Sequence, residues 1–414
     1  MSDRCQRVRR FAHQSPVMPA GIPVHDLRGG SRARRAMPPR GGSPRRDRHA
    51  QQVRELVNGG TPQHGWLKEF ELKAARQADT PHAIAVTSRN VALHLTLQAI
   101  DLRPGDEVIV PAYAPLAVAD VIRHFDAHPI PVDVRSDSLL IDSDGIVDAV
   151  SDRTRAIVAV SIAGRDVVCD SLLAIADAQN LPLIADCSSC PPGILPAVNT
   201  SAAVARLLAA RSPDRSGATG GTLIATFSDE LAVGIRRRGI EIDPEPHVAR
   251  PALPTAGLHY ATRLSEADAL WALAGLDSVT DDWRRRCEIA MSYSANVSSM
   301  AQVDEPPESG RETHAWTGYP LRLNLLRSGL SRNDVATALR NMNVGVSVQC
   351  VPISLHPHYQ ELYAFSGETF PVARNEFQRE LSLPIHADMT DDDIEFVSSA
   401  VQHVIQTGST AARN

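Results

Sequence analysis

The most constraining feature of the sequence is a series of short, continuous apolar runs separated by segments with helical periodicity. The runs are AIAV at 83–86, EVIVP at 107–111, PIPVDV at 129–134, AIVAVSIA at 156–163 and LPLIAD at 181–186. Such runs are typical of strands buried on both faces in a parallel sheet. Because helical patterns alternate with them, the sequence predicts successive βαβ units and an α/β fold.

The C-terminal part of the chain has a different pattern. Residues 262–290 have apolar residues at helical spacing and few breakers, which predicts one long helix or a helix pair between two domains. Beyond it, we expect a strand at 319–326, a helix at 331–343 and a strand at 345–353. Thr390, followed by Asp393 in a capping-box-like position, begins a predicted helix over 390–406.

At 414 residues the chain exceeds the size at which one hydrophobic core usually stops growing. We therefore expect two folded domains. The predicted boundaries are a disordered tail at 1–50, a large domain at 51–262, a linking helix at 263–290 and a small α+β domain at 291–414.

The charge distribution separates the tail from the body. Residues 1–50 contain twelve arginines against Asp3, Asp26 and Asp47, whereas the chain as a whole has a net charge of −6. The tail is also rich in Pro, Gly and Ser, so too little apolar surface is available to offset the entropy of ordering it. We expect a solvated tail, or leader sequence from a start codon called too early. Nucleic-acid binding and a cleaved organellar transit peptide are weaker alternatives, and no amphipathic pattern supports the second.

Two classes of protein are disfavoured by the remaining composition. No run of about 18 apolar residues is present, and no compact apolar N-terminal stretch precedes a cleavage site, so we expect neither a membrane span nor secretion. A cytoplasmic location is the resulting expectation. The six cysteines lack a framework spacing, which argues against structural disulfides.

Several sequence blocks are specific to one family. They are residues 66–122 (with SRNVAL before a helix and PGDEVIVP in a strand), RTRAIVAVSIAG at 153–164, IADCSSC at 184–190, RLSEADALWAL at 263–273, ISLHPHYQELY at 353–363 and LSLPIHADMTDDDIEFV at 381–397. In unbroken order over roughly 51–405, they resemble the DegT/DnrJ/StrS-type sugar aminotransferases.

The resemblance implies a fold-type-I architecture, with a large domain around a mostly parallel seven-stranded sheet and a small C-terminal domain. It also implies pyridoxal phosphate (PLP) or pyridoxamine phosphate (PMP) as cofactor and a homodimer with active sites at the subunit interface. Members mostly transfer an amino group to a keto-sugar bound to a nucleotide. A nucleotide-sugar ligand is therefore expected, and no metal.

The residue that such a reaction needs most is missing. Transamination by PLP requires a lysine amine that forms the internal Schiff base and then shuttles a proton. The chain contains only Lys68 and Lys73, both upstream of the predicted sheet. By resemblance, the lysine position falls on Pro213, counted back from the turn at Gly220 and Gly221. Covalent PLP is therefore not expected.

Other cofactor contacts implied by the resemblance have also changed. Arg89 and Asn90 stand where a Gly-Thr pair supports the phosphate, and Ser189 stands where a glutamine bonds the ring hydroxyl. Asp186 matches the carboxylate that pairs with the pyridine nitrogen, although a strand-ending, turn-capping Asp is an equal interpretation.

Substrate contacts follow the same reasoning. Arg263 matches an arginine that the family retains. Arg89 could bind an anionic group, with an ion pair at the surface or an interface as the favoured alternative. The Cys187–Cys190 pair suggests redox or metal chemistry only weakly, because no further ligands have suitable spacing.

Three functions stay open on this evidence. The chain could be an auxiliary or degenerate member of the family that pairs with itself or with an active paralogue. It could use free PMP to dehydrate a keto-sugar nucleotide, although relatives that do so replace the lysine with histidine. It could also have turned the sugar pocket to cofactor-free chemistry.

Overall fold

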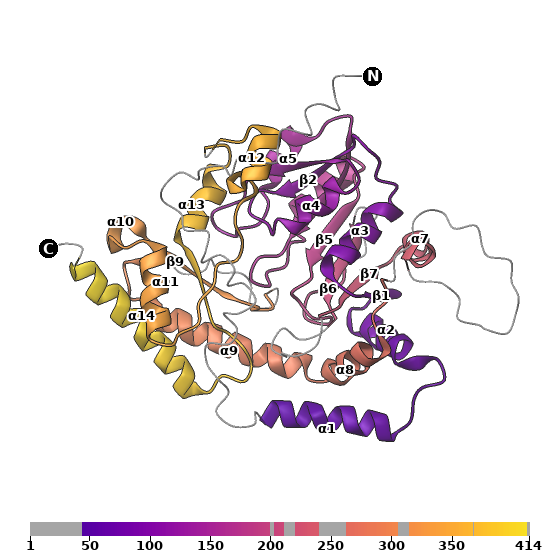
Figure 1. Ribbon diagram of the computed structural model, residues 1–414, viewed down its shortest axis with the longest axis horizontal. Coiled ribbons are helices and arrows are strands. Elements are labelled where there is room, and N and C mark those ends of the chain that lie inside the picture. The colour runs from indigo at the N-terminus through magenta and orange to yellow at the C-terminus, as the bar shows by residue number, and fades with distance from the viewer. Residues whose placement is uncertain are drawn as a thin grey trace, which may run out of the picture.

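The computed structural model describes residues 44–198, 203–210, 220–239, 262–304, 314–366 and 368–411. Figure 1 shows a large sheet flanked by helices, with a smaller C-terminal region beside it. A helix pair, α8 (Glu266–Leu276) and α9 (Val279–Val297), runs from the large sheet to the small region. The two helices are separated at Asp277 and Ser278, so this segment is a helix pair.

The large sheet has seven strands in the order β1-β7-β6-β5-β4-β2-β3. Their bounds are β1 (His82–Val86), β2 (Glu107–Pro111), β3 (His128–Val132), β4 (Thr154–Val160), β5 (Leu183–Cys187), β6 (Ala203–Ala209) and β7 (Thr222–Thr226). Only β7 runs antiparallel to its neighbours, β1 and β6. The predicted α/β fold with a mostly parallel seven-stranded sheet is therefore confirmed.

Two layers of helices cover the two faces of this sheet. One layer consists of α2 (Gly65–Gln77), α5 (Ser143–Ala149), α6 (Asp170–Ala178) and α8, and the other consists of α3 (Arg89–Ala99), α4 (Ala117–Arg123) and α7 (Asp229–Gly239). Side chains alternate along each strand, so Ala185 and Cys187 face the α2 layer while Ile184 faces the α3 layer. The continuous apolar runs are explained by this burial on both faces.

The small region is built on an antiparallel sheet in the order β10-β9-β8. Its elements are β8 (Val303–Asp304), β9 (Tyr319–Leu323), α10 (Leu325–Ser328), α11 (Arg332–Asn341), β10 (Glu380–Leu383) and α14 (Asp391–Ala411). The predicted capping box is present, because Thr390 N donates to Asp393 Oδ2 (3.0 Å) and Asp393 N donates to Thr390 Oγ1 (3.2 Å). The turn η5 (Ile353–Leu355), α12 (Pro357–Tyr363) and α13 (Pro371–Arg379) lie between the two sheets.

Two local predictions were wrong. The strand expected at 345–353 is absent, because this segment pairs with β10 only at the bridge between Ser347 and Ser382 before Ile353 N bonds Ala112 O in the large domain. In addition, helix α1 (Pro44–Asn58) covers residues 44–50, which were assigned to the disordered tail. Tertiary packing explains this difference, since His49 is buried against the ring of Trp271. The rest of that tail, 1–43, lies outside the described residues.

Within the described ranges, no helix combines the length and the apolar character that crossing a bilayer requires.

Candidate functional site

The candidate site lies at the edge of the large sheet where the parallel strands end. Six strands share one direction, so the carboxyl ends of β1, β2, β4 and β5 meet at this edge. Ligands of open α/β sheets bind at such an edge. The loop after β1 leads into Arg89, and β5 delivers Asp186 to the same edge.

Asp186 is deeply buried at this edge, with 1% of its side chain exposed. Its Oδ1 accepts a hydrogen bond from Ser188 N at 3.2 Å. Its Oδ2 accepts no hydrogen bond from any described residue. Because Asp186 and Cys187 are consecutive in a strand, their side chains point to opposite faces, and Asp186 points to the face covered by α3.

Arg89 lies beside this free oxygen. It is the first residue of α3, whose N-terminus is capped by Ser88 through a bond from Val91 N. Its Nε is 3.5 Å from Asp186 Oδ2, which is ion-pair distance, and a quarter of its side chain is exposed. The arginine expected to form a surface or interface ion pair, or to bind an anion, therefore pairs with a buried carboxylate of its own chain.

The other predicted cofactor and substrate residues are less closely grouped. Asn90 is exposed on α3, and Ser189 is half-buried with its Oγ 3.9 Å from Cys190 Sγ. Arg263 is exposed and 3.6 Å from Glu266, although its backbone bridges Val86 at the end of β1. The structure brings together Arg89 and Asp186 and records no contact that joins the other three to them.

The expected lysine position, Pro213, lies outside the described residues. The chain leaves β6 at Ala210, whose N–H bonds Gly221 O at 3.0 Å, and continues into β7 from Gly221. A Cβ on Gly221 would lie 2.7 Å from a Leu264 methyl carbon and 3.0 Å from Val86 O. A glycine is therefore required at Gly221 by the close approach of β1 and the segment that follows Thr262.

The two lysines lie on α2. Lys73 Nζ forms an ion pair with Asp277 at 2.6 Å, and Lys68 is exposed. Helix α2 packs against α8 and β1, on the layer opposite to α3. The two lysine amines are therefore on the far side of the sheet from the Arg89–Asp186 pair.

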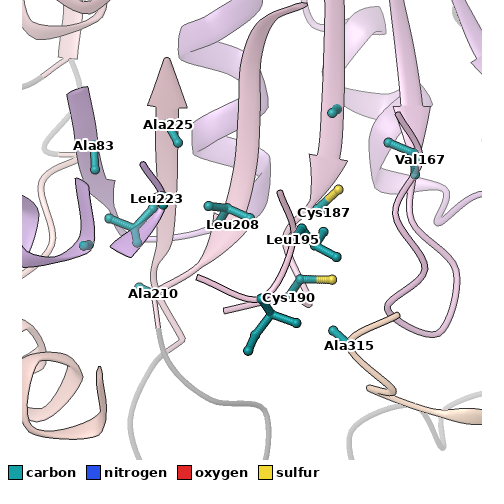
Figure 2. Packing of buried hydrophobic residues seen from close by; sticks show 14 of the residues in the cluster. Ala83, Val167, Cys187, Cys190, Leu195, Leu208, Ala210, Leu223, Ala225 and Ala315 are labelled. Carbon is teal, nitrogen blue, oxygen red and sulfur yellow. The ribbon is translucent and has the colours of Figure 1, made fainter. Parts of the chain in front are cut away.

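Cys187 and Cys190 belong to the hydrophobic core. Figure 2 shows both side chains among Leu195, Leu208 and Ala315. Burial raises the pKa of the Cys187 thiol well above its ordinary value and that of Cys190 to about 11. Both are free thiols, and the described residues contain no cluster with the composition of a metal site. A thiolate is disfavoured at both positions, which supports a packing role.

A second group of polar side chains, which joins the small sheet to the segment after β2, was missed from the sequence. Glu380 of β10 is fully buried and accepts hydrogen bonds from Ser382 Oγ (2.6 Å), Gln349 N (3.1 Å) and Tyr113 Oη (3.3 Å). Tyr113 follows β2 of the large sheet, so the bond connects the two sheets. Burial raises the pKa of Glu380 to about 7, opposed by these donors and by Arg332. The only signal in the sequence is a charged residue that opens the apolar run ELSL.

A buried ion pair on the α2 face of the sheet was also missed. Arg206 of β6 lies 3.2 Å from Asp166, and 10% and 6% of the two side chains are exposed. The signal was an arginine inside the apolar strand AVARLLA. A charged residue in the middle of such a strand needs an opposite charge, but the sequence does not show which one.

Comparison with known proteins places this geometry in a family. The model of the DegT/DnrJ/EryC1/StrS aminotransferase family matches residues 45–191 and 220–402, which is most of the chain. The chain belongs to this family. Membership of this family implies PLP or PMP as the cofactor, as expected from the sequence.

Two relatives match at moderate identity. The spore coat polysaccharide biosynthesis protein SpsC of Bacillus subtilis is 28% identical over 86% of this chain and 95% of its own length. The uncharacterized protein MJ1066 of Methanocaldococcus jannaschii is 29% identical over 81% of this chain and 89% of its own.

Solved structures share the fold at lower identity. DesV of S. venezuelae, in complex with a ketimine intermediate, has a TM-score of 0.75 at 22% identity, over 87% of this chain and 95% of DesV. The putative sugar aminotransferase Spr1654 of Streptococcus pneumoniae, in its PMP form, has a TM-score of 0.74 at 20% identity, over 89% and 97% of the two chains.

Proposed function

We propose that this chain does not transaminate alone and serves as an auxiliary or degenerate member of its family. The observation that carries the proposal is that no lysine occurs after Lys73, so no amine is available to hold PLP covalently at the end of β6. An arginine there is no substitute, because a guanidinium stays protonated and is not a nucleophile. The family model leaves residues 192–219 unmatched, which agrees with divergence around Pro213.

The pathway that we propose is amino-sugar, polysaccharide or antibiotic biosynthesis in the cytoplasm. SpsC is named for spore coat polysaccharide biosynthesis, and Spr1654 is described as a putative sugar aminotransferase. These names support a sugar context. A nucleotide-sugar is the proposed ligand, and selective stabilisation by one such compound in a thermal-shift screen is the expected result.

The proposed assembly is a homodimer or a heterodimer with an active paralogue. Gel filtration of the full chain, alone and mixed with an aminotransferase encoded beside it, tests this assembly. We expect a mixed species with an altered rate of amino transfer by the paralogue. A family member from an unrelated gene cluster is the control. Separate elution at all ratios, with no change in the paralogue's rate, counts against an auxiliary role.

A second candidate is a lysine-independent enzyme that uses free PMP or no cofactor on a keto-sugar nucleotide. One observation favours PMP: Asp186 Oδ2 accepts no hydrogen bond from the described residues, so a pyridinium N–H could donate to it if Arg89, whose Nε lies 3.5 Å away, moved aside. The test is the absorbance spectrum of the purified protein after incubation with millimolar PMP and removal of the excess. Absence of a bound band ends the PMP-dependent candidate.

A further inference from the structure

We propose that Arg89 supplies the positive charge that Asp186 would otherwise receive from a pyridinium ring, so that the Arg89–Asp186 pair and a bound cofactor exclude each other. This inference rests on the proposed function, since it explains how a chain of this fold is stable without a covalent cofactor. Replacement of Arg89 should therefore make both the space and the negative charge of Asp186 available to the cofactor ring.

The two oxygens of the Asp186 carboxylate have different partners. Oδ1 of Asp186 accepts a hydrogen bond from Ser188 N, so Oδ2 is the oxygen available to a ring nitrogen. Arg89 Nε lies 3.5 Å from that oxygen. A charged N–H donor must approach that same oxygen to about 2.7–2.9 Å. The guanidinium and a pyridinium would therefore have to share the space around one oxygen.

The burial of Asp186 makes a nearby positive charge necessary. Asp186 is 1% exposed, and an ionised carboxylate so placed is costly unless an opposite charge accompanies it. In a cofactor-bound relative the ring nitrogen could meet this need. In a chain with no lysine to retain the ring, the charge must come from the protein, and Arg89 is the cation within ion-pair distance among the described residues.

The position of Arg89 at the start of α3 brings its side chain to the carboxylate. The residue opens α3, and the capped N-terminus holds its backbone at the edge of the sheet. The family resemblance places a glycine at this position, which has no side chain to enter the pocket. A quarter of the Arg89 side chain is exposed, and its Nε lies beside the buried carboxylate, so this side chain occupies space that a glycine would leave open.

The test is equilibrium binding of PMP to the full chain, measured by dialysis with absorbance detection. We compare the wild type with Arg89→Gly and with Arg89→Gln, which retains more of the side chain. Both variants should bind PMP about tenfold more tightly or better, which corresponds to one recovered charge-assisted hydrogen bond. The double variant Arg89→Gly/Asp186→Asn should lose that gain. Arg103→Gln, at an exposed arginine paired with Asp101, is the matched control and should bind as the wild type does.

Two results would overturn the inference: equal PMP affinity in the wild type and both Arg89 variants, or no binding to any of them at millimolar PMP. Circular dichroism and gel filtration verify that the variants are folded, and the more conservative Arg89→Gln covers a failure of the glycine variant to fold. The readout is binding, so it is separate from the proposed function. Transamination by the wild-type chain would refute that function, while the affinity ratio would still decide this inference.

Discussion

Asp186 and Glu380 are both buried carboxylates, but their surroundings differ. Asp186 is the last residue but one of β5 in the large sheet, has one backbone donor, and lies 3.5 Å from the guanidinium of Arg89. Glu380 opens a strand of the small sheet, and the three groups that donate hydrogen bonds to it are neutral: a tyrosine, a serine and a backbone N–H. Asp186 therefore has a charged neighbour, whereas the hydrogen-bond donors of Glu380 are neutral groups.

The difference shows two ways to accommodate an acid in a protein interior. A cation in contact with a carboxylate favours its ionised form, whereas burial among neutral groups favours the proton. The pKa of Glu380 is accordingly raised to about 7 by burial, opposed by its hydrogen-bond donors and by the charge of Arg332. We infer that the charge of Asp186 is matched by a neighbouring cation, while Glu380 is a group whose protonation changes near neutral pH.

The largest effect is expected at a third buried carboxylate, Asp166, which pairs with Arg206. Arg206→Met should destabilise the protein by about 3–5 kcal/mol, because it leaves this acid buried without its cation. The measurement is the free energy of unfolding in urea. The double variant Arg206→Met/Asp166→Leu should recover most of the loss. A cost below about 1 kcal/mol for the single variant would contradict the importance of charge pairing on this face.

The second prediction concerns pH and Glu380. A carboxyl whose folded pKa is raised binds its proton more tightly in the folded state, so stability falls as pH rises from about 4.5 to about 7 and is then level. Glu380→Gln removes this loss, which is roughly 3 kcal/mol when complete. The variant should therefore gain stability relative to the wild type between pH 5 and 8, as measured by melting temperature.

The control for that prediction is Glu368→Gln. Glu368 is exposed and pairs with Arg374, so its replacement should leave the pH profile of the wild type unchanged. Parallel pH profiles of the wild type and Glu380→Gln would contradict the assignment of Glu380 as a titrating group.

The third prediction concerns the Arg89–Asp186 pair, in which either residue can be substituted separately. Arg89→Gln leaves a buried carboxylate without a cation, whereas Asp186→Asn leaves a guanidinium that can reach water through its exposed quarter. Arg89→Gln should therefore cost more, by about 1–2 kcal/mol, in urea unfolding at pH 7. Equal costs would mean that Asp186 does not depend on Arg89.

The smallest effect is expected at Lys73. Its ion pair with Asp277 is partly exposed, with 28% and 61% of the two side chains accessible, and such pairs contribute about 0.2–1 kcal/mol. Lys73→Gln should lower stability by no more than this and leave PMP affinity unchanged. A large loss of PMP affinity would give Lys73 a role in the site that its position on α2 does not support.

Local patterns in the sequence predicted the parts of the fold that depend on neighbouring residues. Continuous apolar runs identified β1 to β5, because a strand buried on both faces needs apolar residues at every position. The Thr390 capping box was visible because its two partners are three residues apart. The strand predicted at 345–353 failed because its apolar residues serve contacts with two domains, so composition gave no indication of the missing ladder.

The sequence by itself determined that the chain has only two lysines and that Asp186 ends an apolar run. Tertiary structure alone decided the partners of the buried charges. Arg89 meets Asp186 only because α3 and β5 are brought to one face of the sheet, and Tyr113 meets Glu380 across 267 positions of the chain. Contacts over such separations depend on the packing of whole elements, whereas strands, caps and residue counts are properties of short segments.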